Sequence, residues 1–394
     1  MSRIYLDNAA TTAIDPEVLS AMRPYLEEEY ANPSGAYRFA GITHDRVEEA
    51  RAAIAATIGA EAREIFFTSG GSESDNWALK GVADSLRAKG NHIITTKIEH
   101  HAVLHTCEYL ESHGYDVTYL DVDAYGLVDP AQFEAAIRPS TILASVMFAN
   151  NEIGTIEPIA ELGRIAHEHG VLFHTDAVQA FAHVRINVNE MNIDLMSASA
   201  HKLNGPKGVG LLYIRKGTPV TTLIHGGSQE RGRRAGTTNA AGIIGFGKAT
   251  ELANERLSKT ASHEARLRDR LVSRVLAEIP FVKYNGHPER RLSNNANFCF
   301  RFIEGESLLM LLDQEGICAS SGSACTSGSL DPSHVLLAIG LPHEIAHGSV
   351  RFTLSGTTTE EEIDTTVEIL KRIVERLRSM SPLYEDFIKR NKED

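Results

Sequence analysis

The chain has 394 residues, 42% of them hydrophobic, which is enough for a large core or two, so we expect two domains. A formal net charge of −13 at pH 7 argues against general binding to polyanions, and we expect no nucleic-acid partner. No apolar run reaches transmembrane length, so we expect no membrane association, and four irregularly spaced cysteines without an N-terminal leader predict reduced thiols in the cytoplasm.

In chain order, the sequence predicts an alternation of strands and helices. A short strand leads from Tyr5 into small polar residues that end at Thr12, and one helix separates them from a loop at 31–35. From about Glu64, helical patterns alternate with short apolar strands, which we place at 65–67, 92–95, 117–120, 142–147, 171–173, 193–196 and 210–214. This alternation is typical of an α/β fold, with a largely parallel sheet covered by helices on both faces.

A long amphipathic helix is predicted at 249–279, which contains neither Gly nor Pro. Apolar residues recur along it at four-residue spacing, at Leu267, Leu271, Val275 and Ile279. We interpret this helix as a bridge between two domains. The large domain is placed at 14–258, and a smaller α+β domain comprises 1–13 and 259–394.

The small domain is expected to contain a strand at 297–302 and a helix at 307–314. Its last helix is expected to be capped by Thr358, because Glu361 follows three residues later, as in a capping box. The pattern His-Glu-Ile-Ala-His at 343–347 fits a zinc-protease motif, but flanking Pro and Gly residues and a predicted strand at 350–354 leave no room for the long helix that such a site needs. We therefore expect no metal site.

One lysine is a candidate nucleophile. Lys202 follows an apolar strand and lies inside a turn of small residues. Most lysines are solvated surface charges, but a partly desolvated lysine has a lowered pKa and can form a Schiff base with a carbonyl group. Lys207 is the alternative, yet it lies between Pro206 and Gly208 on the turn itself, where an exposed side chain is expected. We therefore favour Lys202.

Two further features match the needs of pyridoxal phosphate. The stretch at 67–76 leaves a strand through glycine and enters a helix, whose first N–H groups suit a phosphate, although a plain helix cap explains it equally well. Asp176 lies just past an apolar strand, where it could pair with a cationic ring nitrogen or cap the next turn. A Schiff-base lysine and a pyridinium partner are the two groups that a protein supplies to this cofactor.

A histidine and a cysteine complete the candidate residues. His100 follows the strand at 92–95, so it lies on the same carboxyl edge of the sheet and could stack on a flat cofactor or move a proton. Cys325 lies in a Ser/Gly-rich stretch at 320–329, where an exposed thiol risks oxidation unless it is used, although a tolerated loop cysteine is the other interpretation. Core positions are expected for Cys107 and Cys299, and a short strand for Cys318.

Several motifs resemble those of the NifS/IscS-like cysteine desulfurases, which are pyridoxal-phosphate enzymes of the class-V aminotransferase family. The resemblance runs nearly end to end and rests on the segments 150–154, 176–179, 199–202, 226–237 and 320–328. The last of these, Ser-Ser-Gly-Ser-Ala-Cys-Thr-Ser-Gly, resembles the cysteine loop of the long-loop class. The resemblance implies the aspartate aminotransferase type of fold, with a large, mostly parallel-sheet domain and a smaller α+β domain.

The resemblance also implies a role for each site residue. The catalytic residues are Cys325, Lys202 and His100. The residues that hold pyridoxal phosphate are Gly71, Ser72, His100, Asn151, Asp176, Gln179, Ser199, His201, Lys202 and, from the partner subunit of a homodimer, Thr237. The substrate is bound by Arg351, whose guanidinium pairs with the carboxylate, together with Asn151 and Asn32.

The implied reaction converts L-cysteine to L-alanine and leaves the sulfur as a persulfide on Cys325. The implied acceptors are iron–sulfur scaffold proteins or other proteins that take up sulfur. A selenocysteine lyase, an aminotransferase or another pyridoxal-phosphate enzyme of the same fold is the alternative among enzymes. From another class, the alternative is a catalytically idle scaffold that binds assembly partners through its acidic surface.

Overall fold

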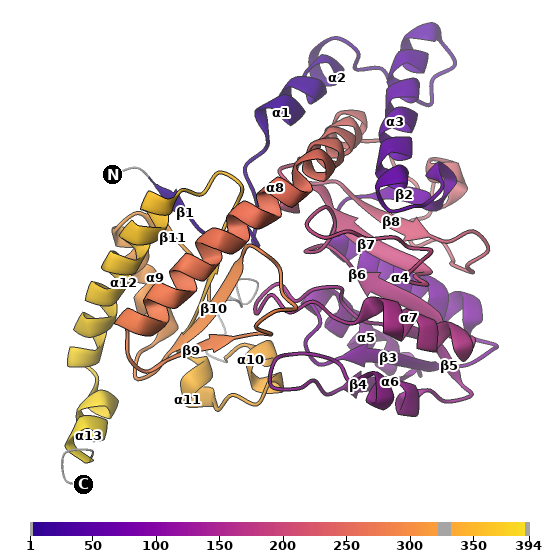
Figure 1. The fold of residues 1–394 in the computed structure, drawn as a ribbon. Helices are drawn as coiled ribbons and strands as arrows, with labels where there is room; N and C mark the ends of the chain where they lie inside the picture. The colour runs from indigo at the N-terminus through magenta and orange to yellow at the C-terminus, as the bar shows by residue number, and fades with distance from the viewer. Residues whose placement is uncertain (1–2, 322–331, 391–394) are drawn as a thin grey trace.

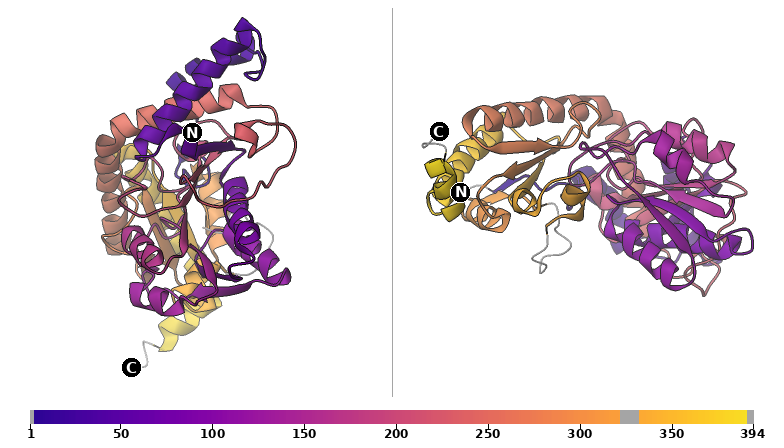
Figure 2. Two further views of the ribbon diagram at one scale, coloured as in Figure 1. Left: turned by 90° about the vertical axis from the view of Figure 1, so that its right-hand side faces the viewer. Right: turned by 90° about the horizontal axis from the view of Figure 1, so that it is seen from below.

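The computed structural model describes residues 3–321 and 332–390. Two lobes lie side by side, and the long helix α8 (Ala240–Glu278) runs from one to the other (Figure 1). The view from below shows α8 extending along both lobes (Figure 2). The larger lobe contains a seven-stranded sheet and the smaller lobe a three-stranded one, as the α/β and α+β patterns predict.

The larger sheet has the strand order β2-β8-β7-β6-β5-β3-β4. Strand β8 is antiparallel to both of its neighbours, and every other pair is parallel. The largely parallel sheet that the sequence predicts is therefore confirmed. Its strands are β2 (Ile65–Thr68), β3 (His92–Thr96), β4 (Asp116–Leu120), β5 (Thr141–Ser145), β6 (Leu172–Asp176), β7 (Leu195–Ser199) and β8 (Gly210–Ile214).

Helices cover both faces of this sheet. Successive side chains in a strand point to opposite faces, so Phe67 packs in one core cluster and Phe66 in the other. The cluster that contains Phe67 includes residues of α3 (Arg38–Thr57), α6 (Pro130–Ala136), α7 (Ile159–Glu168) and α8. The cluster that contains Phe66 includes Trp77 and Val103, from α4 (Gly71–Leu86) and α5 (His101–Ser112). Parallel sheets need this double cover because both of their faces are apolar.

The smaller sheet is antiparallel, with the order β12-β10-β9, and a parallel pair, β1-β11, lies beside it. The zinc-protease pattern forms the four-residue helix α11, and β12 follows it. The strands are β1 (Ile4–Tyr5), β9 (Val282–Asn285), β10 (Asn295–Phe300), β11 (Ile317–Cys318) and β12 (Ser349–Thr353). The helices are α9 (Gly305–Gln314), α10 (His334–Ala338), α11 (His343–Ala346), α12 (Glu360–Ser379) and α13 (Pro382–Arg390).

Helix α8 contributes to the cores of both lobes. Phe246, near its start, packs in the large-lobe core, whereas Leu267, Leu271 and Val275 are fully buried in the small-lobe core. The bridging role is as predicted, but the helix begins at Ala240 rather than at 249. The sequence did not predict this start because glycines, which usually disfavour a helix, lie in its first turns. One of them, Gly247, allows close packing against α3, since a Cβ atom there would lie 2.6 Å from Ala50 Cβ.

Besides the start of α8, two predicted local features are wrong. The single helix expected between Thr12 and the loop at 31–35 is two short helices, α1 (Pro16–Met22) and α2 (Pro24–Glu27), because Pro24 starts a new helix. Helix α12 is capped by Thr359, whose side chain accepts from Glu362 N, and not by Thr358. Both threonines have Glu three residues later, but Thr358 is buried and its hydroxyl accepts from Ser355 N instead.

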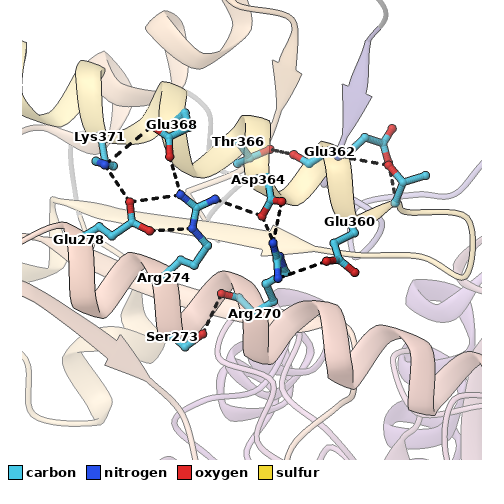
Figure 3. Close-up of polar contacts among 11 residues, drawn as sticks. Arg270, Ser273, Arg274, Glu278, Glu360, Glu362, Asp364, Thr366, Glu368 and Lys371 are labelled. Carbon is cyan, nitrogen blue, oxygen red and sulfur yellow. Dashed lines mark hydrogen bonds and ion pairs between the residues drawn. The ribbon is translucent and has the colours of Figure 1, made fainter.

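Charged side chains join α8 to α12 along the outside of the small lobe (Figure 3). Arg274 contacts Glu278 on its own helix and both Asp364 and Glu368 on α12. Arg270 binds Asp364 through Nε and Nη2 at 2.7 Å each. This network supports the apolar contact between the two helices. No helix within the described residues is long and apolar enough to cross a bilayer.

Candidate active site

Asp176 and Lys202 lie at the carboxyl ends of two adjacent parallel strands. Asp176 is the last residue of β6 and is the register partner of Ser197 on β7. Lys202 ends the one-turn helix η2 (Ala200–Lys202), which follows β7 directly. Its Nζ atom donates to Ala9 O at 2.6 Å and to Ala10 O at 2.8 Å. The lysine is therefore held against the N-terminal segment at the edge where ligands of open parallel sheets bind.

The Asp176 carboxyl is poised for a cationic partner. The residue is 6% exposed, and its Oδ1 atom accepts from Val178 N at 2.9 Å. Burial raises the pKa of this carboxyl, and the nearby His100 and Lys202 offset only part of that effect. A buried carboxyl of this kind gains most from a positive charge brought close to it, because that charge favours the ionised form.

His100 lies on the same edge of the sheet as Asp176. It is the N-cap of α5, and its Nδ1 atom accepts from Ala102 N at 3.1 Å. This hydrogen bond places the ring proton on Nε2. Burial lowers the pKa of His100, so the ring is neutral at neutral pH. A flat, neutral imidazole at this position can stack on a planar ligand and donate from Nε2.

A second group of residues lines a hollow of about 420 Å³ at the start of α4. Gly71 and Ser72 are its first helical residues, where N–H groups have no acceptor inside the helix. Gly70 has φ of +155°, and a Cβ atom on Gly210 would lie 2.6 Å from Gly70 Cα, so only glycines allow the two backbones to meet here. Ser199 and His201 line the same hollow, together with Thr11 and Lys207.

The histidine in this hollow is uncharged. Burial, and then the positive charges of Lys202 and Lys207, lower the pKa of His201 to about 4. Its Nδ1 atom lies 3.1 Å from Thr11 Oγ1. A neutral imidazole, a serine hydroxyl and helix N–H groups together form a donor set that suits a phosphate.

Arg351 is the small-lobe residue that lies at the same edge of the large sheet. It lies in β12, its side chain is 2% exposed, and Nη2 donates to Asp7 Oδ1 at 2.8 Å. Nη1 donates to Asn151 O at 2.9 Å. The guanidinium thus touches the N-terminal segment three residues before Ala10, which holds Lys202. A buried guanidinium here can bind a carboxylate in a two-pronged manner.

The remaining predicted site residues fall into two groups. Gln179 lies beside Lys202 and donates from Nε2 to Ala9 O at 3.0 Å, and Asn151 meets Arg351 through its main chain. Asn32 and Thr237, by contrast, are exposed. They line neither the hollow at α4 nor a second hollow, of about 810 Å³, that Lys202 and Gln179 line. Asn32 follows α2, with its Oδ1 atom accepting from Ser34 N at 3.0 Å. Within a single chain, Asn32 and Thr237 therefore do not lie with the other predicted site residues.

The cysteines differ in their surroundings. Cys325 lies outside the described residues, so its position stays a prediction. Cys107 and Cys299 are fully buried, as expected, and burial raises the pKa of Cys299 to about 11. Cys318 lies on β11, also as expected, and its pKa is raised by burial. Burial thus disfavours the reactive thiolate form at all three described cysteines.

Sequence reasoning missed the residues that hold the site together. Asp7, Ala9 and Ala10 orient the arginine and the lysine, yet the sequence shows only a stretch of small polar residues after a strand. A buried acid, Asp75, was missed as well: it is 1% exposed, and its Oδ1 atom lies 3.7 Å from His174 Nε2. Its position on α4, between helix residues of ordinary type, carries no signal that could have found it.

These residues fit pyridoxal phosphate. The cofactor carries a phosphate, a basic ring nitrogen and an aldehyde, and the site offers a phosphate-type donor set, a buried acid and a constrained lysine. Gly71 tightens the phosphate end, because a Cβ atom there would lie 2.5 Å from Val178 Cγ2. Among the described residues, no group of His, Cys, Asp or Glu side chains has an arrangement that would hold a metal ion.

Comparison with known proteins gives consistent relatives. The family model "Aminotransferase class-V" matches residues 4–366. "Cysteine desulfurase IscS" of Clostridium botulinum (strain Hall) is 56% identical over 394 residues, which cover 100% of this chain and 99% of the relative. A solved "NifS-like protein" superposes with a TM-score of 0.90 at 40% identity, covering 95% of this chain and all of its own.

A second solved structure, titled "SspA in complex with cysteine", has a TM-score of 0.80 at 39% identity and covers 90% of this chain and all of its own. Family model, relatives and structures thus agree along nearly the whole length. The chain belongs to the class-V aminotransferase family of pyridoxal-phosphate enzymes.

Proposed function

We propose that this protein is a cysteine desulfurase, which converts L-cysteine to L-alanine and passes the sulfur on. One observation carries the proposal from the geometry: the Lys202 amine and the Arg351 guanidinium both contact the segment from Asp7 to Ala10. An amine that moves protons therefore lies close to a cation that binds a carboxylate, as an amino-acid substrate requires. The 56% identity to a cysteine desulfurase indicates that this amino-acid substrate is L-cysteine.

When bound, pyridoxal phosphate supplies an aldehyde that captures the substrate amine and a ring that accepts electrons. The residues Gly71, Ser72, Ser199 and His201 would hold its phosphate, and Asp176 would pair with its ring nitrogen. His100 would lie against the ring, and Gln179 and Asn151 would bind its phenolic oxygen.

Lys202 is the base that removes the proton from the substrate Cα atom. Arg351 holds the substrate carboxylate and so fixes which Cα bond faces the lysine, with Asn151 next to its guanidinium. The structure supports these two roles by the contacts that hold both side chains against one short segment.

Cys325 takes the sulfur. Its thiolate attacks the sulfur atom of the substrate, so that an S–S bond forms while the Cβ–S bond breaks. The Cβ atom keeps the bonding electron pair and takes up a proton, which gives alanine. The enzyme is left with a persulfide, the form in which sulfur reaches an external acceptor.

The partners follow from this chemistry. We propose a homodimer, because the exposed Thr237 lines neither of the two hollows that the other described site residues line. We further propose acceptors among iron–sulfur scaffold proteins or other proteins that take up sulfur. We also propose a cytoplasmic location, where the thiols of Cys107, Cys299 and Cys318 stay reduced.

The test compares Cys325→Ser with the parent enzyme. The variant should bind pyridoxal phosphate and L-cysteine normally but form no persulfide, because serine is a poor nucleophile toward sulfur. Mass spectrometry after cysteine addition locates the extra sulfur atom, and Cys318→Ser is the matched control. Sulfur on another cysteine, or alanine formed at the parent rate by Cys325→Ser, contradicts the assignment. Amino transfer that depends on a keto acid would indicate an aminotransferase instead.

A further inference from the structure

The loop between β8 and α8 is fastened to the large sheet by a buried ion pair. Glu230 accepts from Arg51 through both carboxylate oxygens, at 2.7 and 2.9 Å, and the two side chains are only 7% and 5% exposed. The same carboxylate accepts from Phe67 N at 3.0 Å, and Arg51 also donates to Ile65 O. The loop is therefore tied to β2 and to α3 at a single point.

A second two-pronged pair fastens the same loop four residues later. Arg234 donates from Nε and Nη2 to the two oxygens of Glu73, at 2.8 and 3.0 Å. Glu73 lies in the first turn of α4 and lines the phosphate hollow, and it also accepts from Ser69 N at 2.8 Å. Arg234 thus binds a residue that lines the phosphate site of its own chain. We call the pairs Arg51–Glu230 and Glu73–Arg234 the loop clamp.

The backbone between the two pairs is strained. Glu230 and Arg231 are consecutive non-glycine residues with φ of +47° and +58°. The left-handed conformation is unfavourable for residues that carry a Cβ atom. A loop keeps such a conformation only where its surroundings determine it, and the clamp, together with the bond from Arg231 Nη2 to Ile65 O at 2.7 Å, supplies that constraint.

The clamp lies just before Thr237, the residue that the proposed homodimer assigns to the phosphate site of the partner subunit. Thr237 follows Arg234 by three residues, is exposed, and does not line the phosphate hollow that Glu73 lines. We propose that the loop clamp is a positioning device that sets Thr237 against the cofactor phosphate of the partner subunit. This inference rests on the homodimer of the proposed function. Through Glu73, the clamp also links the phosphate site of one subunit to the loop that completes the other.

Breaking the clamp should weaken cofactor binding without altering the chemistry of the bound cofactor. Glu230→Gln removes the charge that both Arg51 and Phe67 N bind, and hydrogen bonds to charged groups are worth about 1.5–3 kcal/mol, so we expect the Kd for pyridoxal phosphate to rise about 10- to 100-fold. Arg234→Gln breaks the less buried pair and should raise Kd in the same direction. Both values come from titrating apoenzyme with the cofactor and following its absorbance.

The matched control is Arg46→Gln. Arg46 lies on α3 like Arg51 and pairs with Glu49 at 2.5 Å, but both side chains are more than half exposed. Its loss should leave Kd unchanged. Thermal unfolding of each apoenzyme separates a folding defect from a positioning defect. If Glu230→Gln and Arg234→Gln both bind the cofactor as tightly as Arg46→Gln, the clamp has no positioning role.

Mixed dimers decide between action on the partner and action within one subunit. In the first, one subunit carries Lys202→Ala and the other Glu230→Gln; in the second, both changes are on one subunit and the other is unchanged. Borohydride trapping reports only sites that keep Lys202. We expect normal cofactor affinity at that site in the first dimer and weakened affinity in the second. The reverse result overturns the proposal, whereas absence of alanine formation by the unaltered enzyme would refute only the desulfurase assignment.

Discussion

A single amine, that of Lys202, is positioned by two main-chain carbonyl groups some 190 residues away in the sequence, those of Ala9 and Ala10. We expect Lys202→Ala to fold and to bind pyridoxal phosphate noncovalently, but to lose turnover completely, because no other base lies at its position. Lys207→Ala should keep most of its turnover at saturating cofactor, since Lys207 is exposed on the turn and lines only the phosphate hollow. Borohydride reduction followed by peptide mapping checks both expectations, and a label on Lys207 would contradict them.

For single residues, the sequence predicts the edge of the sheet on which they lie better than it predicts which groups they contact. Strand ends and a glycine-rich helix start were enough to bring Asp176, Lys202 and Gly71 to one edge of a sheet, because parallel strands share their carboxyl edge. The partners of Arg351 and Lys202 could not be predicted, because a contact between residues 7 and 351 leaves no periodic trace in the chain. A residue that is exposed in one chain, such as Thr237, is equally hidden from such reasoning, and only the resemblance implies a role for it.

Among the elements, the pair α8 and α12 combines an apolar contact with an outer row of charges (Figure 3). A hydrogen bond from Arg274 holds the pKa of Glu278 at about 2, with Lys371 adding to it, and one from Arg270 does the same for Asp364. These folded-state values lie below the unfolded values of about 4. The stabilisation is therefore complete above about pH 5 and is lost as the pH falls toward 2.

We expect Arg274→Gln to lower the Tm by about 1–2 °C at pH 7, because it removes the partner of three carboxylates that solvent partly screens. The difference from the parent protein should shrink as the pH falls through 4 and as salt is added. The control is Arg266→Gln, also on α8, which breaks one exposed pair with Glu360 of α12. A Tm gap that persists at low pH would mean that packing, not charge, joins the helices.

The elements themselves were predicted well where periodicity is strong and poorly at their ends. The strand at 210–214 matches β8 residue for residue, and the other strands of the large sheet are displaced by one to three residues at an end. The start of α8 and the cap of α12 were misplaced. In both cases the local pattern was ambiguous, since glycines can break a helix or pack it closely, and two adjacent threonines both satisfy the capping pattern.

The two lobes are held together at the site by two buried arginines with different partners. Arg351 of the small lobe reaches Asn151 O in the large lobe and the charged Asp7. Arg291, also in the small-lobe part of the chain, donates to Ile153 O of the large lobe at 3.1 Å and to three carbonyl groups near it, those of Asn285, His287 and Asn295. Both side chains bridge the lobes, but only Arg351 also contacts the N-terminal segment that holds Lys202.

This difference predicts a separation of binding from stability. Arg351→Lys keeps a charge but loses the planar two-pronged fork, so we expect the KM for L-cysteine to rise about tenfold or more, with the cofactor absorbance unchanged. Arg291→Lys loses bridging bonds between the lobes and should lower the Tm while leaving the KM for L-cysteine near the parent value. Steady-state kinetics and thermal unfolding of both variants check the pair. An unchanged KM in Arg351→Lys would remove this residue from the substrate site, and a raised KM in both would show that lobe alignment, not carboxylate binding, controls substrate affinity.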